Sequence, residues 1–216
     1  MDQQRTRIKF CGITRLEDLL AGAALGVDAV GFVLAAGSPR RLPLDAAAAL
    51  RRRLPPLLTA VALLRNPSAA EVRQAIEILR PDLLQFHGDE SAEFCAGFGL
   101  PYLKAVGMRG QRRPLLEIAA EYAAAAALLL DGHGAGEPGG QGVAFDWSAA
   151  RDAGKPLILA GGLDAANVGL AIAAARPYAV DVSSGIEAAP GIKDSGKMEA
   201  FVRAVRDADT SLSTIP

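Results

Sequence analysis

The sequence predicts an α/β fold in which eight parallel strands close into one (β/α)8 TIM barrel. Eight short apolar runs alternate with helical patterns along all 216 residues. Most of these runs are continuously apolar, which is typical of strands covered on both faces. No linker or change of composition divides the chain, so we expect a single domain over residues 1–216. A doubly wound open sheet is the competing fold for strictly alternating strands and helices.

The strand candidates run from one end of the chain to the other. In order they are Ile8–Cys11, Ala29–Val33, Thr59–Leu63, Leu83–Phe86, Tyr102–Ala105, Ala127–Leu130, Leu157–Ala160 and Ala179–Val182. Their count matches that of a closed eight-stranded barrel, whose usual size is about 200 residues or more.

The segments between the strands have helical patterns. Thr14 and Glu17 form a capping-box pattern that predicts the start of the first helix, and Gly26 can end it. Ser68 and Glu71 repeat the capping box before the third helix. The other helices are expected over Asp45–Leu54, Glu90–Ala96, Pro114–Tyr122, Asp146–Asp152, Ala165–Ala174 and a C-terminal stripe of Met198, Phe201, Val202 and Val205.

Composition argues against several classes of protein. Lys and Arg total 23 against 24 Asp and Glu, and this balance does not favour binding to nucleic acid or to a membrane surface. The longest apolar stretch, Tyr122–Leu130, is far below the about 20 residues that a membrane-spanning helix needs. Two scattered cysteines and a polar N-terminus predict a cytoplasmic location. The His and Cys residues lack metal-site spacing, and no P-loop or dinucleotide fingerprint occurs.

Two residues with acid–base chemistry fall at strand ends, where a parallel barrel places its active site. Cys11 ends the first run, and Asp131 follows the sixth. A thiolate can remove a proton while a carboxylic acid donates one, although the thiol would need a pKa below its free value of about 8.5. Each residue also has a structural alternative, because a small buried Cys is often core and an Asp after a strand is often a turn residue.

Glycine-rich turns after the last two strands predict a phosphate site. Gly161 and Gly162 follow the seventh run, and Ser184 and Gly185 follow the eighth. Backbone N–H groups at such turns can hold a phosphate, and barrels often bind one after strands 7 and 8. One Gly-Gly pair alone would more often be a tight turn, but two turns on adjacent strands favour an anion site.

Three further polar residues follow strands near the same end. Arg40 and Arg41 could bind a substrate carboxylate bidentately, or they could lie in a solvated loop. His87 follows the fourth run, where it is either a donor facing the ligand or an ordered strand-end residue.

A series of short motifs occurs in a fixed order along almost the whole chain. They are KFCGITR (Lys9–Arg15), GSPRR (Gly37–Arg41), LLQFHGDE (Leu83–Glu90), LLLDGHGAGEPGGQG (Leu128–Gly142) followed by FDW, LILAGGL (Leu157–Leu163), VDVSSGIE (Val180–Glu187) and PGIKD (Pro190–Asp194). Any one of them is weak, but the ordered set resembles the phosphoribosylanthranilate isomerase family.

The resemblance implies an enzyme of tryptophan biosynthesis that interconverts an aldose and a ketose without cofactor or metal. The implied reaction is the Amadori rearrangement of N-(5-phospho-β-D-ribosyl)anthranilate to 1-(2-carboxyphenylamino)-1-deoxy-D-ribulose 5-phosphate. It also implies that Cys11 is the general base, that Asp131 is the general acid and that Arg40 binds the anthranilate carboxylate. The implied partner is thus a small phosphorylated aminosugar, and the chain is expected to be a monomer or a homodimer.

Two other kinds of barrel are the alternatives. Another phosphate-binding barrel enzyme is one, but indole-glycerol-phosphate synthase would carry catalytic Lys and Glu, and the histidine-pathway isomerase uses two aspartates. Cys11 at the first strand argues against both of these enzymes. The other alternative is a non-catalytic sugar-phosphate-binding barrel, which would not need both Cys11 and Asp131.

Overall fold

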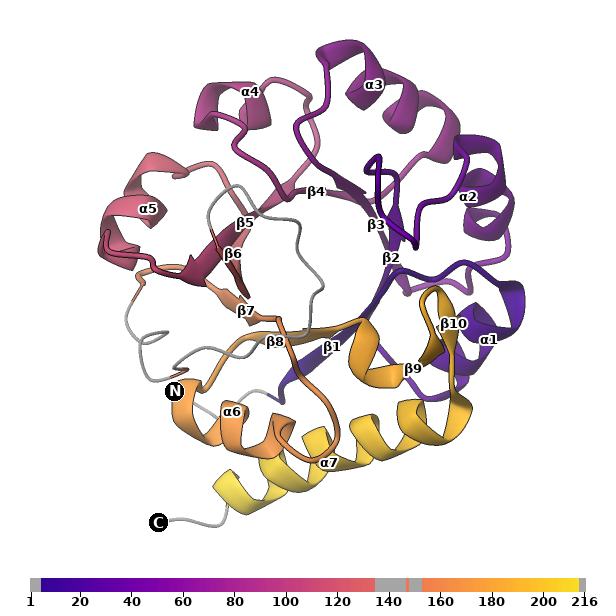
Figure 1. The fold of residues 1–216 in the computed structure, drawn as a ribbon, viewed down its shortest axis with the longest axis vertical. Coiled ribbons are helices and arrows are strands. Elements are labelled where there is room, and N and C mark those ends of the chain that lie inside the picture. Colours follow the sequence, from indigo (N-terminus) through magenta and orange to yellow (C-terminus); the bar gives the residue numbers. More distant parts are fainter. Residues whose placement is uncertain (1–4, 135–146, 148–152, 214–216) are drawn as a thin grey trace.

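The computed structural model describes residues 5–134, 147 and 153–213 of the chain. Eight parallel strands close into a barrel in the order in which they follow along the chain (Figure 1). They are β1 (Arg7–Cys11), β2 (Ala29–Val33), β3 (Thr59–Leu64), β4 (Leu83–Phe86), β5 (Tyr102–Arg109), β6 (Ala127–Gly134), β7 (Leu157–Leu159) and β8 (Ala179–Val182). Because β8 pairs with β1, the predicted barrel is confirmed and the open sheet is wrong.

Helices surround the ring of strands, as predicted (Figure 1). They are α1 (Leu16–Ala24), α2 (Leu44–Arg51), α3 (Ala69–Gln74) with its π-helical continuation η1 (Ala75–Leu79), α4 (Ala92–Ala96), α5 (Leu115–Glu121), α6 (Val168–Ala175) and α7 (Ser195–Ser213). A short 3-10 turn, η3 (Ser184–Ile186), and a hairpin of β9 (Glu187–Ala189) and β10 (Ile192–Lys193) separate β8 from α7. The helix expected over Asp146–Asp152 lies, apart from Trp147, outside the described residues.

One of the two predicted capping boxes forms. The Ser68 hydroxyl accepts a hydrogen bond from the Glu71 backbone, and the Glu71 carboxylate accepts one from the Ser68 backbone. The box predicted at Thr14 is wrong, since α1 begins one residue later and has Arg15 at its N-cap without a side-chain cap. The Thr14 hydroxyl instead donates to the carbonyl of Gly191, which the β9–β10 hairpin brings over the start of α1.

Strands β5 and β6 extend further than the apolar pattern predicts. The pairing continues past their apolar residues, with Gly107 opposite Asp131 and Arg109 opposite Gly134. Asp131 therefore lies within β6 and not after it, because β5 supplies a backbone partner at that level. The extended backbone also fixes the direction of the Asp131 side chain, since alternate residues of a strand face the same side.

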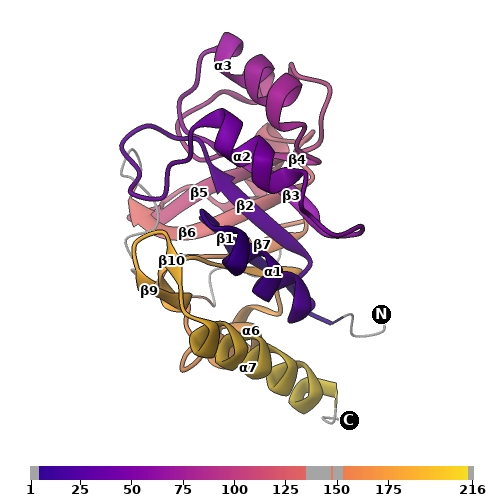
Figure 2. The same ribbon diagram turned by 90° about the vertical axis from the view of Figure 1, so that its right-hand side faces the viewer.

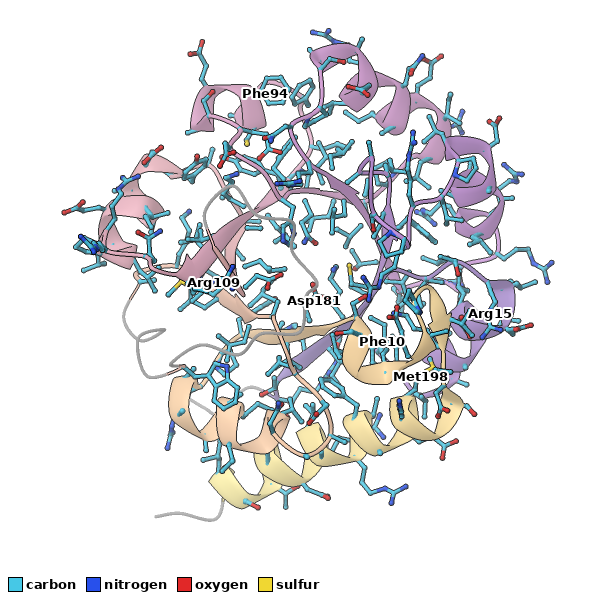
Figure 3. The ribbon with its side chains drawn as sticks, viewed as in Figure 1. Phe10, Arg15, Phe94, Arg109, Asp181 and Met198 are labelled. Carbon is cyan, nitrogen blue, oxygen red and sulfur yellow. The ribbon has the colours of Figure 1, made fainter. Side chains whose placement is uncertain are left out.

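Apolar side chains fill both sides of the barrel wall. On the outside, Phe10 meets Phe201 of α7 edge to face at a centroid distance of 6.3 Å, and Figure 3 shows Phe10 between β1 and α7. On the inside, Leu129 and Ile158 belong to a separate cluster of buried apolar residues. Leu129 precedes Asp131 by two residues, so this inner layer supports the polar side chains at the strand ends.

The strand ends meet at one mouth of the barrel. Figure 2 shows the β9–β10 hairpin at the end of the molecule away from the N-terminus. All eight strands are parallel, so their carboxyl ends lie together at this mouth. Among the described residues, no helix combines the length and the apolar character that crossing a membrane requires.

Candidate active site

A cavity of about 480 Å³ lies at the mouth of the barrel. Among the residues predicted from the sequence, the following line it: Cys11, Arg40, His87, Asp131, Gly161, Gly162 and Ser184. The strand ends converge there, and the period of two along each strand turns Cys11 and Asp131 toward the interior. The structure thus places a thiol from the first strand and a carboxyl group from the sixth around one cavity.

Cys11 is the last residue of β1, and only 6% of it is exposed. Its neighbours on the cavity wall include Val33 and Leu63, both apolar. Burial raises the pKa of the Cys11 thiol, and the ammonium groups of Lys9 and Lys193 oppose that rise without cancelling it. This direction is opposite to the one that the role of a base would favour, because the apolar wall disfavours the charged thiolate.

Asp131 lies against His87 across the cavity from β1. The Nε2 atom of His87 is 3.3 Å from a carboxylate oxygen of Asp131. The side-chain amide nitrogen of Gln85 is 3.0 Å from Nδ1 of the same ring. With the Gln85 amide nitrogen as the donor, Nδ1 accepts a hydrogen bond, and Nε2 is the ring nitrogen that borders Asp131. His87 therefore both lines the cavity and positions the Asp131 carboxyl group.

Arg40 extends from the loop after β2 and is held by Glu187 of β9. Its Nε and Nη2 atoms donate to the two carboxylate oxygens of Glu187 at 2.8 and 2.7 Å. A Cβ atom on Gly12 would lie 2.6 Å from Cδ of Arg40, so Gly12 leaves room for the Arg40 stem. The pair with Glu187 occupies one edge of the guanidinium group. The group has five N–H donors, and its second edge can bind another carboxylate. Arg41 is exposed and does not line the cavity.

Lys193 of β10 anchors the hairpin to the mouth of the barrel. Its ammonium group is fully buried and donates to the carbonyls of Cys11 and Ser183, at 2.7 and 3.1 Å. It also donates to Glu187 at 2.9 Å. Burial tends to raise the pKa of Glu187, but hydrogen bonds from Arg40 and Lys193 outweigh it and hold that pKa below the ordinary value of 4.5. Glu187 thus balances two cations at once, the buried Lys193 and the partly buried Arg40.

Replacing Glu187 with glutamine is expected to lower the free energy of unfolding by about 3 kcal/mol at neutral pH, because these two cations lose their counter-charge. Since the folded-state pKa of Glu187 is lowered, its contribution is complete above its ordinary pKa and is lost as pH falls through the folded value. Urea unfolding of both proteins at pH 7 and about pH 3 checks this. A stability difference of the same size at both pH values would contradict it.

The predicted phosphate site lies at the ends of β7 and β8. Gly161 and Gly162 have positive φ angles of 80° and 64°, which turn the chain sharply toward the cavity. Ser184 and Gly185 open the turn η3, whose first N–H groups have no acceptor within the turn. Gly185 lies behind the lining, where a Cβ atom would come within 1.9 Å of the Leu163 carbonyl oxygen. Its backbone fixes the distance between the two loops, and its side-chain position does not face the cavity.

The lining of the cavity suits an anionic ligand. Arg40 and Arg65 contribute guanidinium groups, and the two turns contribute backbone N–H groups. Sequence reasoning had not selected Arg65, which follows β3. In the described part of the chain, no group of three or more His, Cys, Asp or Glu side chains is placed to hold a metal ion.

Other polar residues of the interior were also missed from the sequence. Lys9, Gln85 and Asp181 are buried within strands that otherwise read as apolar. The available signal was the period of two, since Lys9 precedes Cys11 by two residues and Gln85 precedes His87 by two. Where a barrel strand ends in a polar residue at the active site, a polar residue two positions earlier therefore indicates a buried side chain one layer deeper in the barrel.

The chain is similar in sequence and in fold to known proteins. It matches the family described as N-(5'phosphoribosyl)anthranilate (PRA) isomerase over residues 8–204. A protein of Pseudomonas putida (strain GB-1), described as N-(5'-phosphoribosyl)anthranilate isomerase, is 52% identical over 94% of this chain and 98% of its own length. Phosphoribosyl anthranilate isomerase from Thermus thermophilus has a crystal structure with a TM-score of 0.83 and 39% identity, over 94% of this chain and 99% of that one. A phosphoribosyl anthranilate isomerase crystallised with reduced 1-(o-carboxyphenylamino)-1-deoxyribulose 5-phosphate has a TM-score of 0.82 and 35% identity over the same shares.

Proposed function

This chain belongs to the N-(5'-phosphoribosyl)anthranilate isomerase family, and on that premise we propose that Cys11 is its general base and Asp131 its general acid. The reaction converts N-(5-phospho-β-D-ribosyl)anthranilate into 1-(2-carboxyphenylamino)-1-deoxy-D-ribulose 5-phosphate, a step of tryptophan biosynthesis. The observation that carries the assignment is that a thiol and a carboxyl group share one cavity with a glycine-rich anion site. The two free thiols of the chain also support the expected cytoplasmic location.

The chemistry proceeds by two proton transfers. Asp131, in its protonated form, donates to the furanose ring oxygen while the anilino nitrogen assists ring opening, which gives a Schiff base. Cys11, as a thiolate, then removes the proton from C2′, and the resulting enolamine tautomerises to the ketone. His87 holds the Asp131 carboxyl group in place during the first transfer. Each group supplies roughly 10²–10⁴-fold in rate.

Binding energy comes from the two anionic ends of the substrate. The phosphate lies at the turns that contain Gly161, Gly162, Ser184 and Gly185, where backbone N–H groups meet it. The anthranilate carboxylate lies on the edge of Arg40 that Glu187 leaves open. With both ends held, the sugar carbons lie between the two sites, in the cavity that Cys11 lines.

Replacing Arg40 with methionine is expected to raise KM by about 10- to 100-fold, since a charged hydrogen-bonded pair contributes about 1.5–3 kcal/mol. The value of kcat should change less, because the carboxylate remains unchanged during the reaction. Steady-state kinetics test this, with Arg41→Met as the matched control because Arg41 is exposed and outside the cavity. Equal effects of the two substitutions on KM would contradict the assignment.

The function as a whole is tested by the fluorescence of phosphoribosylanthranilate, which falls as the substrate is consumed. We expect turnover by the purified protein, and the same turnover after treatment with a metal chelator. Phosphate binding without turnover would instead indicate a non-catalytic sugar-phosphate-binding barrel. The protein would be another barrel enzyme if it left phosphoribosylanthranilate unchanged and instead turned over the substrate of indole-glycerol-phosphate synthase or of the histidine-pathway isomerase.

A further inference from the structure

A buried lysine–aspartate pair lies inside the barrel beside Cys11. The Lys9 ammonium group donates to Asp181 at 2.9 Å, and the two side chains are only 4% and 6% exposed. Lys9 and Asp181 stand directly opposite each other in the β1–β8 register. Figure 3 shows Asp181 inside the ring of strands. Burying two charges costs free energy, and a packed apolar pair would serve the fold equally well.

Lys9 also reaches the catalytic thiol. It precedes Cys11 by two residues on β1, so both side chains face the interior. Gly31 of β2 stands opposite Cys11 in the register, and a Cβ atom there would lie 2.9 Å from the Cys11 sulfur and 3.1 Å from the Lys9 ammonium nitrogen. The thiol and the ammonium group therefore border the same space, which a glycine keeps open. At this separation the positive charge of Lys9 lowers the pKa of the Cys11 thiol, against the effect of burial.

The other charges that face Cys11 already have several partners. The Lys193 ammonium group is shared among two carbonyl oxygens and Glu187, and the Arg40 guanidinium is paired with Glu187. The Asp181 carboxylate opposes a thiolate by its negative charge. Lys9, by contrast, donates to Asp181 and borders the same space as the Cys11 sulfur.

We propose that Lys9 is a positioning residue that stabilises the Cys11 thiolate for proton abstraction, with Asp181 holding the ammonium group in place. Before substrate binds, the thiol gives its proton to solvent, and Lys9 stays protonated throughout. The thiolate then takes the C2′ proton and becomes the thiol again. The inference rests on the proposed role of Cys11 as the general base.

The test compares the ionisation of Cys11 in the wild type, Lys9→Met, Lys9→Arg and Lys104→Met. Lys104 is the matched control, because its pair with Glu90 is as short and as buried, at 2.7 Å with side chains 5% and 2% exposed, but packs against Tyr122 on the outer side of the wall. Ionisation is measured in the free enzyme as the rate of alkylation by iodoacetamide against pH, with the modified cysteine identified by mass spectrometry. Burial raises the pKa of the only other thiol, Cys95, to about 12, so it does not interfere.

We expect Lys9→Met to raise the pH midpoint of Cys11 alkylation by about 1–3 units, which is the shift that a nearby opposite charge causes. The rising limb of kcat/KM against pH should move with it, whereas Lys9→Arg and Lys104→Met should keep both midpoints close to the wild-type values. If Lys9→Met does not fold, the double variant Lys9→Met/Asp181→Asn, which leaves no unpaired buried charge, is compared with Asp181→Asn, so that the two proteins differ only at Lys9.

An unchanged alkylation midpoint in Lys9→Met, or an equal shift in Lys104→Met, would overturn the inference. This outcome is distinct from failure of the base assignment, which would appear as retained turnover in Cys11→Ala. The alkylation midpoint is measured without substrate, so it reports on Lys9 and Cys11 alone.

Discussion

Replacing Cys11 with alanine is expected to lower kcat by about 10²–10⁴-fold while the barrel stays folded. In the proposed mechanism the thiolate removes the C2′ proton, and the Asp181 carboxylate, which also lines the cavity, is tied to Lys9 at 2.9 Å. Cys11 borders an existing cavity, so loss of its sulfur enlarges that cavity without emptying the packed core. Single-turnover kinetics and thermal unfolding of the same preparation measure both effects.

Cys95 provides the matched control for this substitution. It is the second cysteine of the chain, fully buried on α4 and absent from the cavity lining. Cys95→Ala should therefore reduce stability, as a core truncation does, and should leave kcat within a few-fold of the wild type. Near-normal turnover of Cys11→Ala would show that another group is the base.

The pH dependence distinguishes Cys11 further. Burial raises the pKa of its thiol, so kcat/KM of the wild type should rise with pH on the neutral-to-alkaline side as the thiolate forms. In Cys11→Ala this rising limb should vanish, since the residual activity no longer depends on that ionisation. A rising limb that persists with the same midpoint would assign it to another group.

The barrel itself could be predicted from local pattern. Largely apolar runs identified all eight strands, because a strand covered on both faces needs apolar side chains at most of its positions. The rule that polar residues at strand ends meet at one mouth was enough to bring Cys11, His87 and Asp131 together. The extension of β6 beyond Asp131 could not be predicted, because the added pairing depends on the neighbouring strand β5 and not on the residues of β6.

The charged contacts of the site could not be predicted, for a different reason. The partner of Arg40 is Glu187, 147 residues away, and that of Lys9 is Asp181, 172 residues away. Such pairs exist only after β8 has closed on β1 and the β9–β10 hairpin has folded over the mouth. A sequence pattern predicts the face of the strand on which each side chain lies. The charged partner of that side chain is determined only when the sheet closes into a barrel.

Replacing Asp131 with asparagine is the second substitution expected to remove most of kcat, again by about 10²–10⁴-fold. An amide has nearly the shape of a carboxyl group and keeps the contact with His87, but it cannot transfer a proton to the ring oxygen. The substitution therefore tests proton donation separately from packing. Asp89→Asn is the control, since Asp89 is exposed on the loop after β4 and lies outside the cavity lining.

A binding measurement distinguishes loss of proton donation by Asp131 from a general disruption of the site. A reduced, ring-opened product analogue carries both anionic ends but needs no proton from Asp131, so its affinity for Asp131→Asn should stay within a few-fold of the wild type. Its contacts would be with Arg40 and with the turns at Gly161 and Ser184, none of which the substitution alters. Isothermal titration with this analogue, beside single-turnover kinetics, measures both properties. If affinity falls as far as the rate does, Asp131 acts in binding, and the acid that opens the furanose ring is another group.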